Sequence, residues 1–357
     1  MADVQPFRAV RYSGAAGPLA DLVAPPYDAV DESERAALYT RSPYNVVHVT
    51  LPESPESAAL LYEDWFARGI LEHDDAEAVW LALEDYVGPD GVPRRRRGVI
   101  VSVLAEEYER GSVLPHERTH AEIIGERLAL LRATRIQPEP LLLLADSPIP
   151  LDPPDRPCDL EVAGTMLWRI PRTQALNVGT LLIADGHHRY ESAVALGVET
   201  GEPVRIMALV VPTDDPGLQV FPTHRLFSGR PDLAAAVEGE PCGDLDAALG
   251  LLAGAGYERS AAVAVRRGSV TVLRGEEGEP DTGLVDGHGH EGIGYTHRLE
   301  DAVAAVERGE ADVAYLMRHP RIEDVFRAAR QGERMPPKST YFQPKPVSGL
   351  VFHPLTA

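Results

Sequence analysis

Residues 179–197 read Gly-Thr-Leu-Leu-Ile-Ala-Asp-Gly-His-His-Arg-Tyr-Glu-Ser-Ala-Val-Ala-Leu-Gly. The apolar run at 181–184 is short, which predicts a buried strand. Beyond it, small and apolar residues return with the i, i+3, i+4, i+7 spacing of a helix, at Tyr190, Ala193, Val194 and Gly197. A strand followed at once by a helix predicts an α/β fold, which we expect to contain a mixed sheet.

Five polar or glycine residues fill the turn between the strand and the helix, in the order Asp185, Gly186, His187, His188 and Arg189. The start of a helix carries unpaired N–H groups and a partial positive charge. Gly186 permits a tight turn or the close approach of a ligand, and the guanidinium of Arg189 can bind a phosphate with two hydrogen bonds. We therefore expect a phosphate-binding turn. The alternative is a helix-capping Asp185 with two structural histidines, and the turn alone does not separate binding, phosphoryl transfer and metal chemistry.

The segment 184–193 resembles the Asp/Asn-Gly-His-x-Arg turn of ParB-like and sulfiredoxin-like proteins, a superfamily that includes free-serine kinases. The resemblance implies a ParB/sulfiredoxin-like core around residues 180–226, with nucleotide phosphates at the helix N-terminus. The whole chain also resembles a prokaryotic family catalogued as domain of unknown function 1015. The matching segments are 24–28, 42–47, 116–119, 184–193, 221–226, 335–342, 344–345 and 348–350.

The size and charge of the chain limit what it can be. Its 357 residues are 44% hydrophobic, enough for a large core in one elaborate domain or two. We expect an N-terminal α/β region over 1–150 and a core with a closing C-terminal region over 160–357, or one continuous domain, because 146–158 is rich in Pro and Asp. The net charge of −21 argues against non-specific nucleic-acid binding, which needs basic residues.

Nothing in the sequence predicts secretion or membrane insertion. The N-terminus lacks a basic and then apolar signal pattern, and no apolar run approaches the ~18 residues of a membrane span. Cys158 and Cys242 lie far apart and do not have the spacing of a zinc site. We expect a soluble, cytoplasmic protein without nucleic-acid or membrane partners. The sequence leaves its oligomeric state open.

Two N-terminal segments supply candidate ligand residues. Prolines 25 and 26 stiffen the loop that presents Tyr27 and Asp28. Asp28 is either a pocket residue, as the family resemblance favours, or the cap of a helix over 31–39. The β-branched residues of 45–51 predict a strand, and we expect Asn45 and Tyr27 to contact substrate.

His116-Glu117-Arg118-Thr119-His120 matches the H-E-x-x-H pattern of zinc proteases. Pro115 precedes it, however, and helical periodicity begins only near Ile123. We therefore favour Glu117 as a general base and His116 as a group that contacts phosphate or orients that base. A zinc hydrolase remains the alternative. Arg127 is either a second anion ligand or a surface charge of the following helix.

Two further segments complete the candidate site. His224 and Arg225 follow a predicted strand, where open α/β folds place ligand residues; a surface loop is the alternative. Lys338, Ser339 and Thr340 supply one cation and two hydroxyls, a set suited to phosphate, although the P-loop pattern is missing. We expect this C-terminal segment to close the site at the central turn, with Lys338 as the cation that completes it.

The leading hypothesis is phosphoryl transfer between a nucleotide, ATP or ADP, and a small hydroxyl compound such as serine. Mg²⁺ would bridge phosphate oxygens, with no metal ligands assigned. Glu117 or Asp28 would act as base, and Lys338 and Arg225 would neutralise charge. Three alternatives stay open: a phosphomonoester hydrolase in which His187 or His188 protonates the leaving group, a non-catalytic nucleotide-binding protein, and the zinc hydrolase through His116, Glu117 and His120.

Overall fold

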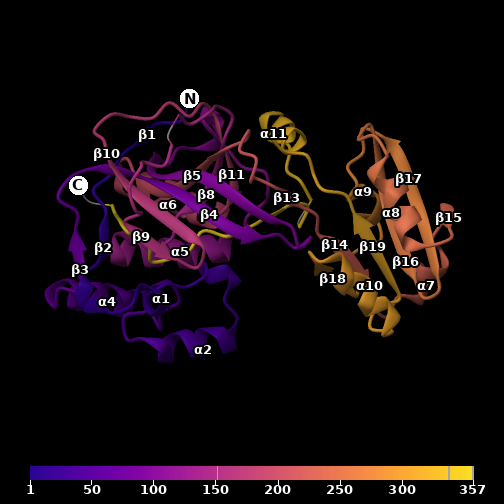
Figure 1. Ribbon diagram of the computed structural model, residues 1–357, viewed down its shortest axis with the longest axis horizontal. Helices are drawn as coiled ribbons and strands as arrows, with labels where there is room; N and C mark the ends of the chain where they lie inside the picture. The colour runs from indigo at the N-terminus through magenta and orange to yellow at the C-terminus, as the bar shows by residue number, and fades with distance from the viewer. Residues whose placement is uncertain (151, 337, 356–357) are drawn as a thin grey trace.

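Two β-sheets form two lobes that lie side by side in the structure, a computed structural model that describes residues 1–150, 152–336 and 338–355 (Figure 1). The sheet of the first lobe runs in the order β6-β11-β8-β12-β5-β4-β10-β9, with β1 paired to β5. Its strands are β1 (Val4–Gln5), β4 (Ala78–Val87), β5 (Pro93–Leu104), β6 (Val113–Leu114), β8 (Leu141–Ala145), β9 (Leu160–Val162), β10 (Thr165–Pro171), β11 (Leu181–Asp185) and β12 (Arg205–Pro212).

This first sheet is mixed, as expected from the sequence. β8 pairs in parallel with β12 and antiparallel with β11. Alternate residues of β8 enter different cores: Leu141 and Leu143 pack on one face, and Leu142 and Leu144 pack on the other. Because both faces are covered, these central strands are apolar throughout rather than alternating.

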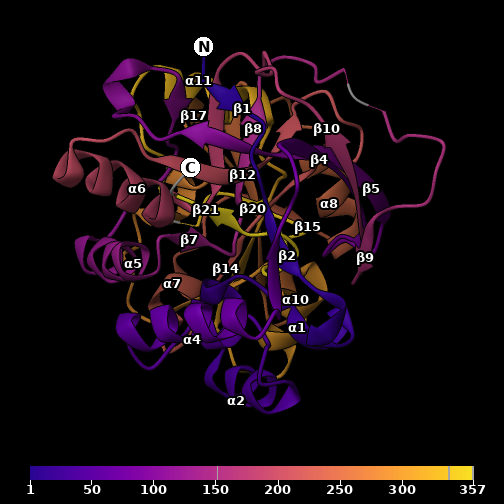
Figure 2. The same ribbon diagram turned by 90° about the vertical axis from the view of Figure 1, so that its left-hand side faces the viewer.

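Different parts of the chain cover the two faces. Helices α5 (Ala121–Thr134) and α6 (His187–Thr200) lie next to each other on one side (Figure 2). Helix α11 (Ile322–Arg330) and residues 342–351 pack on the other side. We call residues 335–350 the tail; Pro337, part of the matched C-terminal segment, lies outside the described residues. The tail therefore belongs to the first lobe, although it follows the second lobe in the sequence.

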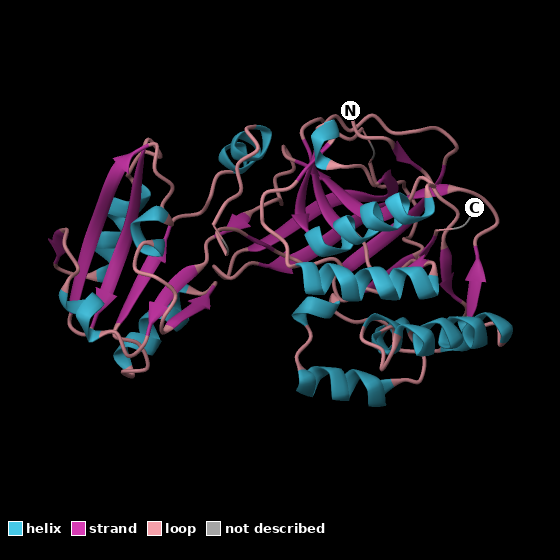
Figure 3. Cartoon of the chain, turned by 180° about the vertical axis from the view of Figure 1, so that it is seen from behind, coloured by secondary structure: helices cyan, strands magenta, loops and turns pink. Residues whose placement is uncertain are grey.

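The N-terminal segment forms a helical layer below this sheet, with α1 (Leu19–Leu22), α2 (Glu32–Arg41), α3 (Val47–Thr50) and α4 (Pro55–Ala67) (Figure 3). The prediction of a strand over 45–51 is wrong, because the side-chain carbonyl of Asn45 accepts a hydrogen bond from Val47 N (3.0 Å) and starts a helical turn. Burial of Val47 and Val49 explains their apolar character equally well. Asp31, not Asp28, caps α2 through Glu34 N.

The second lobe is built on a separate sheet, in the order β15-β17-β16-β19-β14-β18. Its strands are β14 (His224–Phe227), β15 (Glu240–Cys242), β16 (Arg259–Arg266), β17 (Ser269–Glu277), β18 (Ile293–Thr296) and β19 (Val313–Met317), and its helices are α7 (Pro231–Ala235), α8 (Leu245–Ala253), α9 (Gly283–Asp286) and α10 (Leu299–Glu307). The loop after β8, where the sequence places a boundary, connects two strands of the first sheet. The expected boundary at 150–160 therefore does not separate the sheets.

Short strand pairs tie the tail region back to the first lobe. β20 (Tyr341–Phe342) pairs with β13 (Val220–Phe221), the strand just before the second lobe. β21 (His353–Pro354) pairs with β7 (Ile136–Gln137), which follows α5. Within the described residues, no helix combines the length and apolar character required to cross a membrane.

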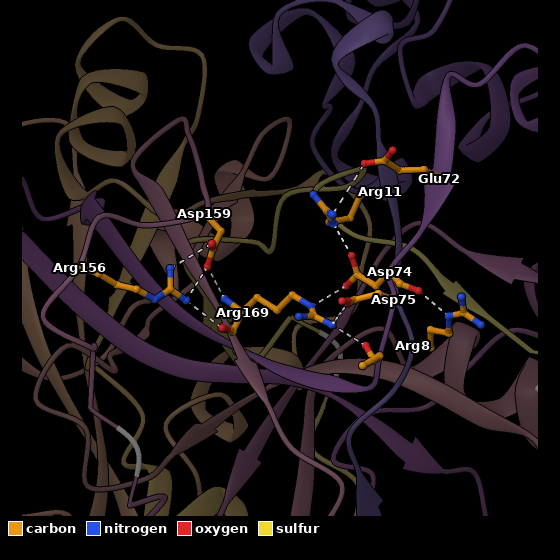
Figure 4. A network of polar contacts seen from close by, with 9 residues as sticks. Arg8, Arg11, Glu72, Asp74, Asp75, Arg156, Asp159 and Arg169 are labelled. Atoms are coloured by element: carbon orange, nitrogen blue, oxygen red, sulfur yellow. Dashed lines mark hydrogen bonds and ion pairs between the residues drawn. The ribbon is translucent and has the colours of Figure 1, made fainter.

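A buried carboxylate joins β2 (Val10–Tyr12) and β3 (Leu71–His73) to the large sheet (Figure 4). The side chain of Asp74 is 1% exposed and accepts hydrogen bonds from Arg11 Nε (2.6 Å) and Arg169 Nε (3.1 Å). Arg8 donates to the backbone carbonyl of Asp74. This network holds the N-terminal segment to β10 and has no connection to the candidate site described below.

Candidate functional site

The central turn has the predicted strand–turn–helix geometry. β11 ends at Asp185, Gly186 has φ 96°, and α6 begins at His187. A Cβ at Gly186 would lie 2.3 Å from Leu141 Cδ2, so both the left-handed backbone and the space require glycine.

The side chains of the turn make more internal contacts than the sequence indicated. Arg189 Nη2 donates to Asp185 Oδ2 (3.1 Å), and Nη1 donates to the carbonyls of Pro140 (3.1 Å) and Glu139 (3.3 Å). Both terminal nitrogens of the guanidinium are therefore already engaged by the protein. The geometry makes Arg189 a residue that fixes Asp185, and does not present it as a free phosphate ligand.

The two histidines of the turn anchor the loop 115–120, which we call the His-Glu loop. His187 Nε2 accepts from His116 N (3.3 Å), and His188 Nε2 accepts from His120 N (3.1 Å). Burial lowers the pKa of His187 well below its ordinary value, so its ring is neutral at pH 7. Thr119 Oγ1 adds a bond to Glu191 Oε2 on α6 (2.8 Å). These contacts give both histidines a positioning role and leave neither well placed to protonate a leaving group.

His116 connects the loop to the tail. Its Nδ1–H donates to the carbonyl of Ile183 (2.6 Å). Burial lowers its pKa to about 4, so the ring is neutral and Nε2 is an acceptor. Thr340 therefore donates its hydroxyl proton to His116 Nε2 (2.9 Å). The predicted use of Thr340 as a phosphate ligand competes with this bond.

The zinc-hydrolase alternative lacks its geometry. Residues 116–120 precede α5, which begins at Ala121, so His116 and His120 do not share a helical face. Across the described ranges, no group of three or more His, Cys, Asp or Glu side chains is arranged to hold a metal ion.

Glu117 is the group at this site best suited to accept a proton. Its side chain is 33% exposed, and burial raises its pKa, while the charges of Lys338 and Lys345 act in the opposite direction. Its Oε1 lies 3.9 Å from His116 Nε2. A carboxylate with a raised pKa beside cations is typical of catalytic acid–base groups.

Lys345 is a site residue missing from the sequence-based candidate set. Its ammonium group forms an ion pair with Asp185. Burial lowers its pKa, and the charges of Asp28 and Glu117 raise it. The sequence held a usable signal, because only two of its 34 basic residues are lysines, Lys338 and Lys345. Lys338 is exposed and has φ 59°. Its charge lowers the pKa of Glu117, but among the described residues the two side chains form no hydrogen bond or ion pair.

The tail contacts the His-Glu loop. Met335 N donates to the carbonyl of His116 (2.8 Å), in addition to the Thr340 bond. The hydroxyl of Ser339 is used within the tail, where it donates to the carbonyl of Pro336 (2.6 Å).

His224 and Arg225 lie on the second sheet. His224 Nδ1 accepts from Met317 N (3.1 Å), and burial lowers its pKa to about 4. Arg225 is 1% exposed and donates to the carbonyl of Thr223 (2.7 Å) and to Asp286 (3.3 Å). His224 is therefore structural, whereas Arg225 also lines a cavity between the lobes.

That cavity, which we call the interlobe cleft, has a volume of about 400 Å³. Its wall includes Arg225, Tyr257, Arg334, Met335 and Ser339. Arg334 was not predicted. It donates only to the carbonyls of Gly332 and Glu333 within the described residues, and its charge lowers the pKa values of His116 and His187. Met335, which also lines the cleft, donates its backbone N–H to the carbonyl of His116 (2.8 Å), so the cleft reaches the His-Glu loop.

The remaining candidates from the sequence are Asn45, Asp28, Tyr27 and Arg127. Asn45 is fully buried, and its amide nitrogen donates to the carbonyls of Asp21 (2.8 Å) and Val23 (3.1 Å), so its contacts are structural. Asp28 is exposed and acts on Lys345 by its charge. Tyr27 stacks under the guanidinium of Arg127, 4.2 Å from the ring centre. Arg127 belongs to the wall of a separate cavity described below.

Comparison with solved structures finds matches at low identity and with TM-scores below 0.5. A free serine kinase in complex with AMP has a TM-score of 0.43 and 18% identity, over 74% of this chain and 95% of the other. A conserved hypothetical protein from Pyrococcus furiosus has a TM-score of 0.38 and 20% identity, over 68% and 90%. SbnI with a C-terminal truncation, from Staphylococcus aureus, has a TM-score of 0.40 and 12% identity, over 68% and 82%.

Sequence comparison gives the family. No curated protein matches the chain. The family model described as "Protein of unknown function (DUF1015)" matches residues 4–154 and 164–240. These two segments cover more than half of the sequence and include the His-Glu loop and the central turn. The chain belongs to the DUF1015 family.

Proposed function

We propose that this protein transfers a phosphoryl group from a nucleotide to a hydroxyl group of a small metabolite. The observation that carries the proposal is the position of Glu117, whose Oε1 lies 3.9 Å from His116 Nε2 next to the central turn, where Lys345 pairs with Asp185. Burial raises the pKa of Glu117, and the charges of the only two lysines of the sequence act on it in the opposite direction. Phosphoryl transfer depends mainly on positioning and on neutralising phosphate charge, and a proton acceptor within the field of two lysines is suited to both requirements.

Each group has a role in this proposal. Glu117 accepts the proton of the attacking hydroxyl. Lys338 and Lys345 neutralise the charge of the transferred group, as lysines do in phosphate sites. His187, His188 and His116 fix the His-Glu loop and the tail around Glu117.

The interlobe cleft is the proposed nucleotide site. Its volume of about 400 Å³ lies within the ~300–1,000 Å³ typical of small-molecule sites. Arg225 Nη2 is buried without a hydrogen-bond partner among the described residues, and Arg334 has no carboxylate within 4 Å in the same residues. These two guanidinium groups are suited to nucleotide phosphates. We also propose that residues 180–226 form a core similar to that of ParB-like and sulfiredoxin-like proteins.

Mg²⁺ fits the carboxylates present. It is usually bound by one or two protein carboxylates together with substrate phosphates, and Asp28 is an exposed carboxylate near Lys345. When bound, the ion would supply additional charge neutralisation.

The test is incubation of the purified protein and Mg²⁺ with ATP, ADP or CTP and a panel of small alcohols that includes serine. Mass spectrometry detects a phosphorylated alcohol. We expect Glu117→Gln to lower turnover by roughly 10²–10⁴-fold, the usual contribution of general base catalysis. The matched control is Glu122→Gln, an exposed glutamate at the start of α5.

A second panel of phosphomonoesters without nucleotide separates transfer from hydrolysis. Phosphate release there, with no product in the nucleotide reactions, would replace the proposal with a phosphomonoester hydrolase. If the Glu117→Gln variant turned over as fast as the wild type, Glu117 would not be the general base.

A further inference from the structure

A second, smaller cavity lies behind the central turn, away from the interlobe cleft. It has a volume of about 50 Å³. Its polar wall includes Thr50 of α3, Tyr62 of α4, Arg127 of α5, Arg189 of α6 and Glu139, together with Thr134, Gln137 and Ser192. We call it the rear cavity. The two cavities share no lining residue.

Four buried polar atoms in this wall have no hydrogen-bond partner among the described residues. They are Thr50 Oγ1, Tyr62 OH, Arg127 Nε and Arg189 Nε. Thr50 is 1% exposed, Tyr62 4% and Arg189 9%. All four groups can donate a hydrogen bond. Buried donors without acceptors are costly, and all four of these residues line one cavity, which favours an acceptor-rich ligand there.

The charges of the wall also favour an anion. Arg127 has no carboxylate within 4 Å among the described residues; its Nη1 donates to the carbonyl of Thr50 (3.0 Å). Glu139 faces both arginines, and burial raises its pKa. Its Oε1 already accepts from Tyr27 N (2.9 Å) and Ser348 Oγ (3.1 Å). Arg189 already pairs with Asp185 (3.1 Å), so the guanidinium group of Arg127 is the cation of this wall that has no carboxylate partner among the described residues.

We propose that the rear cavity binds a short-chain monocarboxylate of the size of formate, acetate or glycolate. At ~10–15 Å³ per water-sized site, the cavity volume is on the order of four such sites, too small for a nucleotide. The carboxylate oxygens accept from Arg127 Nε, Arg189 Nε and the two hydroxyls. Arg189 also donates to Asp185, which pairs with Lys345. Occupancy of the rear cavity is thus linked through one arginine to the proposed phosphate site.

Binding is measured without nucleotide, so the result is independent of the proposed phosphoryl transfer. Isothermal titration calorimetry and thermal unfolding use sodium acetate, formate, butyrate and inorganic phosphate, each balanced with sodium chloride to constant ionic strength. We expect a saturable heat and a saturable rise in Tm with acetate or formate, and neither with butyrate or phosphate.

Two variants locate the response. Arg127→Met and Tyr62→Phe should each weaken acetate binding by about tenfold, the scale of a lost hydrogen bond to a charged group. Arg132→Met is the matched control, because Arg132 lies on the same helix and pairs with Glu199 on the surface; its affinity for acetate should equal that of the wild type. Tyr62→Phe keeps the test usable if Arg127→Met does not fold. No saturable response in the wild type, or an affinity for acetate in Tyr62→Phe and Arg127→Met that equals the wild-type affinity, would overturn the proposal and assign the cavity to water. A saturable response to phosphate alone would also overturn it.

Discussion

Lys345 forms an ion pair with Asp185, although the two residues are 160 positions apart in the sequence. Asp185 ends the central strand of the predicted motif, and Lys345 comes from the tail. The charges of Asp28 and Glu117 also act on this amine and raise its pKa. A turn with few free cations of its own thereby acquires one from a distant segment.

Lys345→Met should change the pH dependence of the proposed reaction. The charge of Lys345 lowers the pKa of Glu117, and a general base is active only when deprotonated. Loss of the charge therefore raises this pKa and moves the acid limb of kcat/KM to higher pH. The measurement is a pH–rate profile, with Arg267→Met as control, an exposed charge on the second lobe. An acid limb that stays in place would show that Glu117 and Lys345 are not coupled in the active protein.

Amine-directed reagents should label the site selectively. The chain has two lysines, and only Lys338 is exposed. We expect acylation under mild conditions at Lys338 and the N-terminal amine, followed more slowly by Lys345 because it is largely buried and paired with Asp185. Nucleotide should protect the lysines but not the N-terminus. Peptide mass spectrometry measures the extent of acylation at each amine. Equal labelling of Lys338 with and without nucleotide would show that this lysine does not belong to the nucleotide site.

Asp74→Asn should destabilise the fold without affecting the site. The substitution removes the charge that compensates Arg11 and Arg169 at a position 1% exposed. Breaking a buried ion pair costs about 3–5 kcal/mol. The control is Asp75→Asn, whose carboxylate is 89% exposed and pairs with the same Arg169; its cost should be at most about 1 kcal/mol. Urea unfolding measures the free energy of unfolding of both variants. A similar loss of stability in the two would contradict the claim that the buried ion pairs of Asp74 stabilise the fold more than the exposed pair of Asp75.

Stability should fall between about pH 6.5 and about pH 4, in part because of His116. Its pKa in the folded protein is about 4, against 6.5 for an ordinary histidine side chain. In this window the unfolded chain binds a proton that the native ring does not, so acid favours unfolding. A shift of this size corresponds to about 3 kcal/mol. Urea unfolding across this range should give a shallower dependence for His116→Gln than for the wild type. Equal slopes would mean that the ring is not buried in its neutral form.

The parts of the fold that follow local rules were predictable from the sequence. The turn at 185–189 combines an apolar run, a glycine that must adopt φ 96° and a helical repeat, and each signal is local. The strand expected at 45–51 failed because Val47 and Val49 suit a buried helix as well as a strand, and Asn45 decides between them through one side-chain bond. The residue types of this segment do not show by themselves that this hydrogen bond forms.

The site was harder to predict because its side chains are engaged by distant backbone. Arg189 donates to the carbonyls of Glu139 and Pro140, and His187 accepts from the amide of His116. The residue types at the turn are those of a phosphate site, but which nitrogens remain free depends on which loop packs against them. The tail was expected to supply a cation, yet the spacing of Lys338 and Lys345 does not show which one reaches Asp185.

The return of the tail to the first lobe has a consequence for biosynthesis. Chains are made from the N-terminus, and domains generally fold as units during synthesis. The central turn and the His-Glu loop leave the ribosome long before the tail, and the entire second lobe is translated in between. Until the tail is made, Asp185 lacks its lysine partner. The chain between the two residues is more than a hundred residues long, but the entropic cost of closing such a loop grows only slowly with its length. Under the proposed function, a nascent chain stopped within the second lobe would hold Glu117 but neither lysine, and would lack the cations required for phosphoryl transfer. Assembly of the tail would therefore act as a completion check on the proposed reaction.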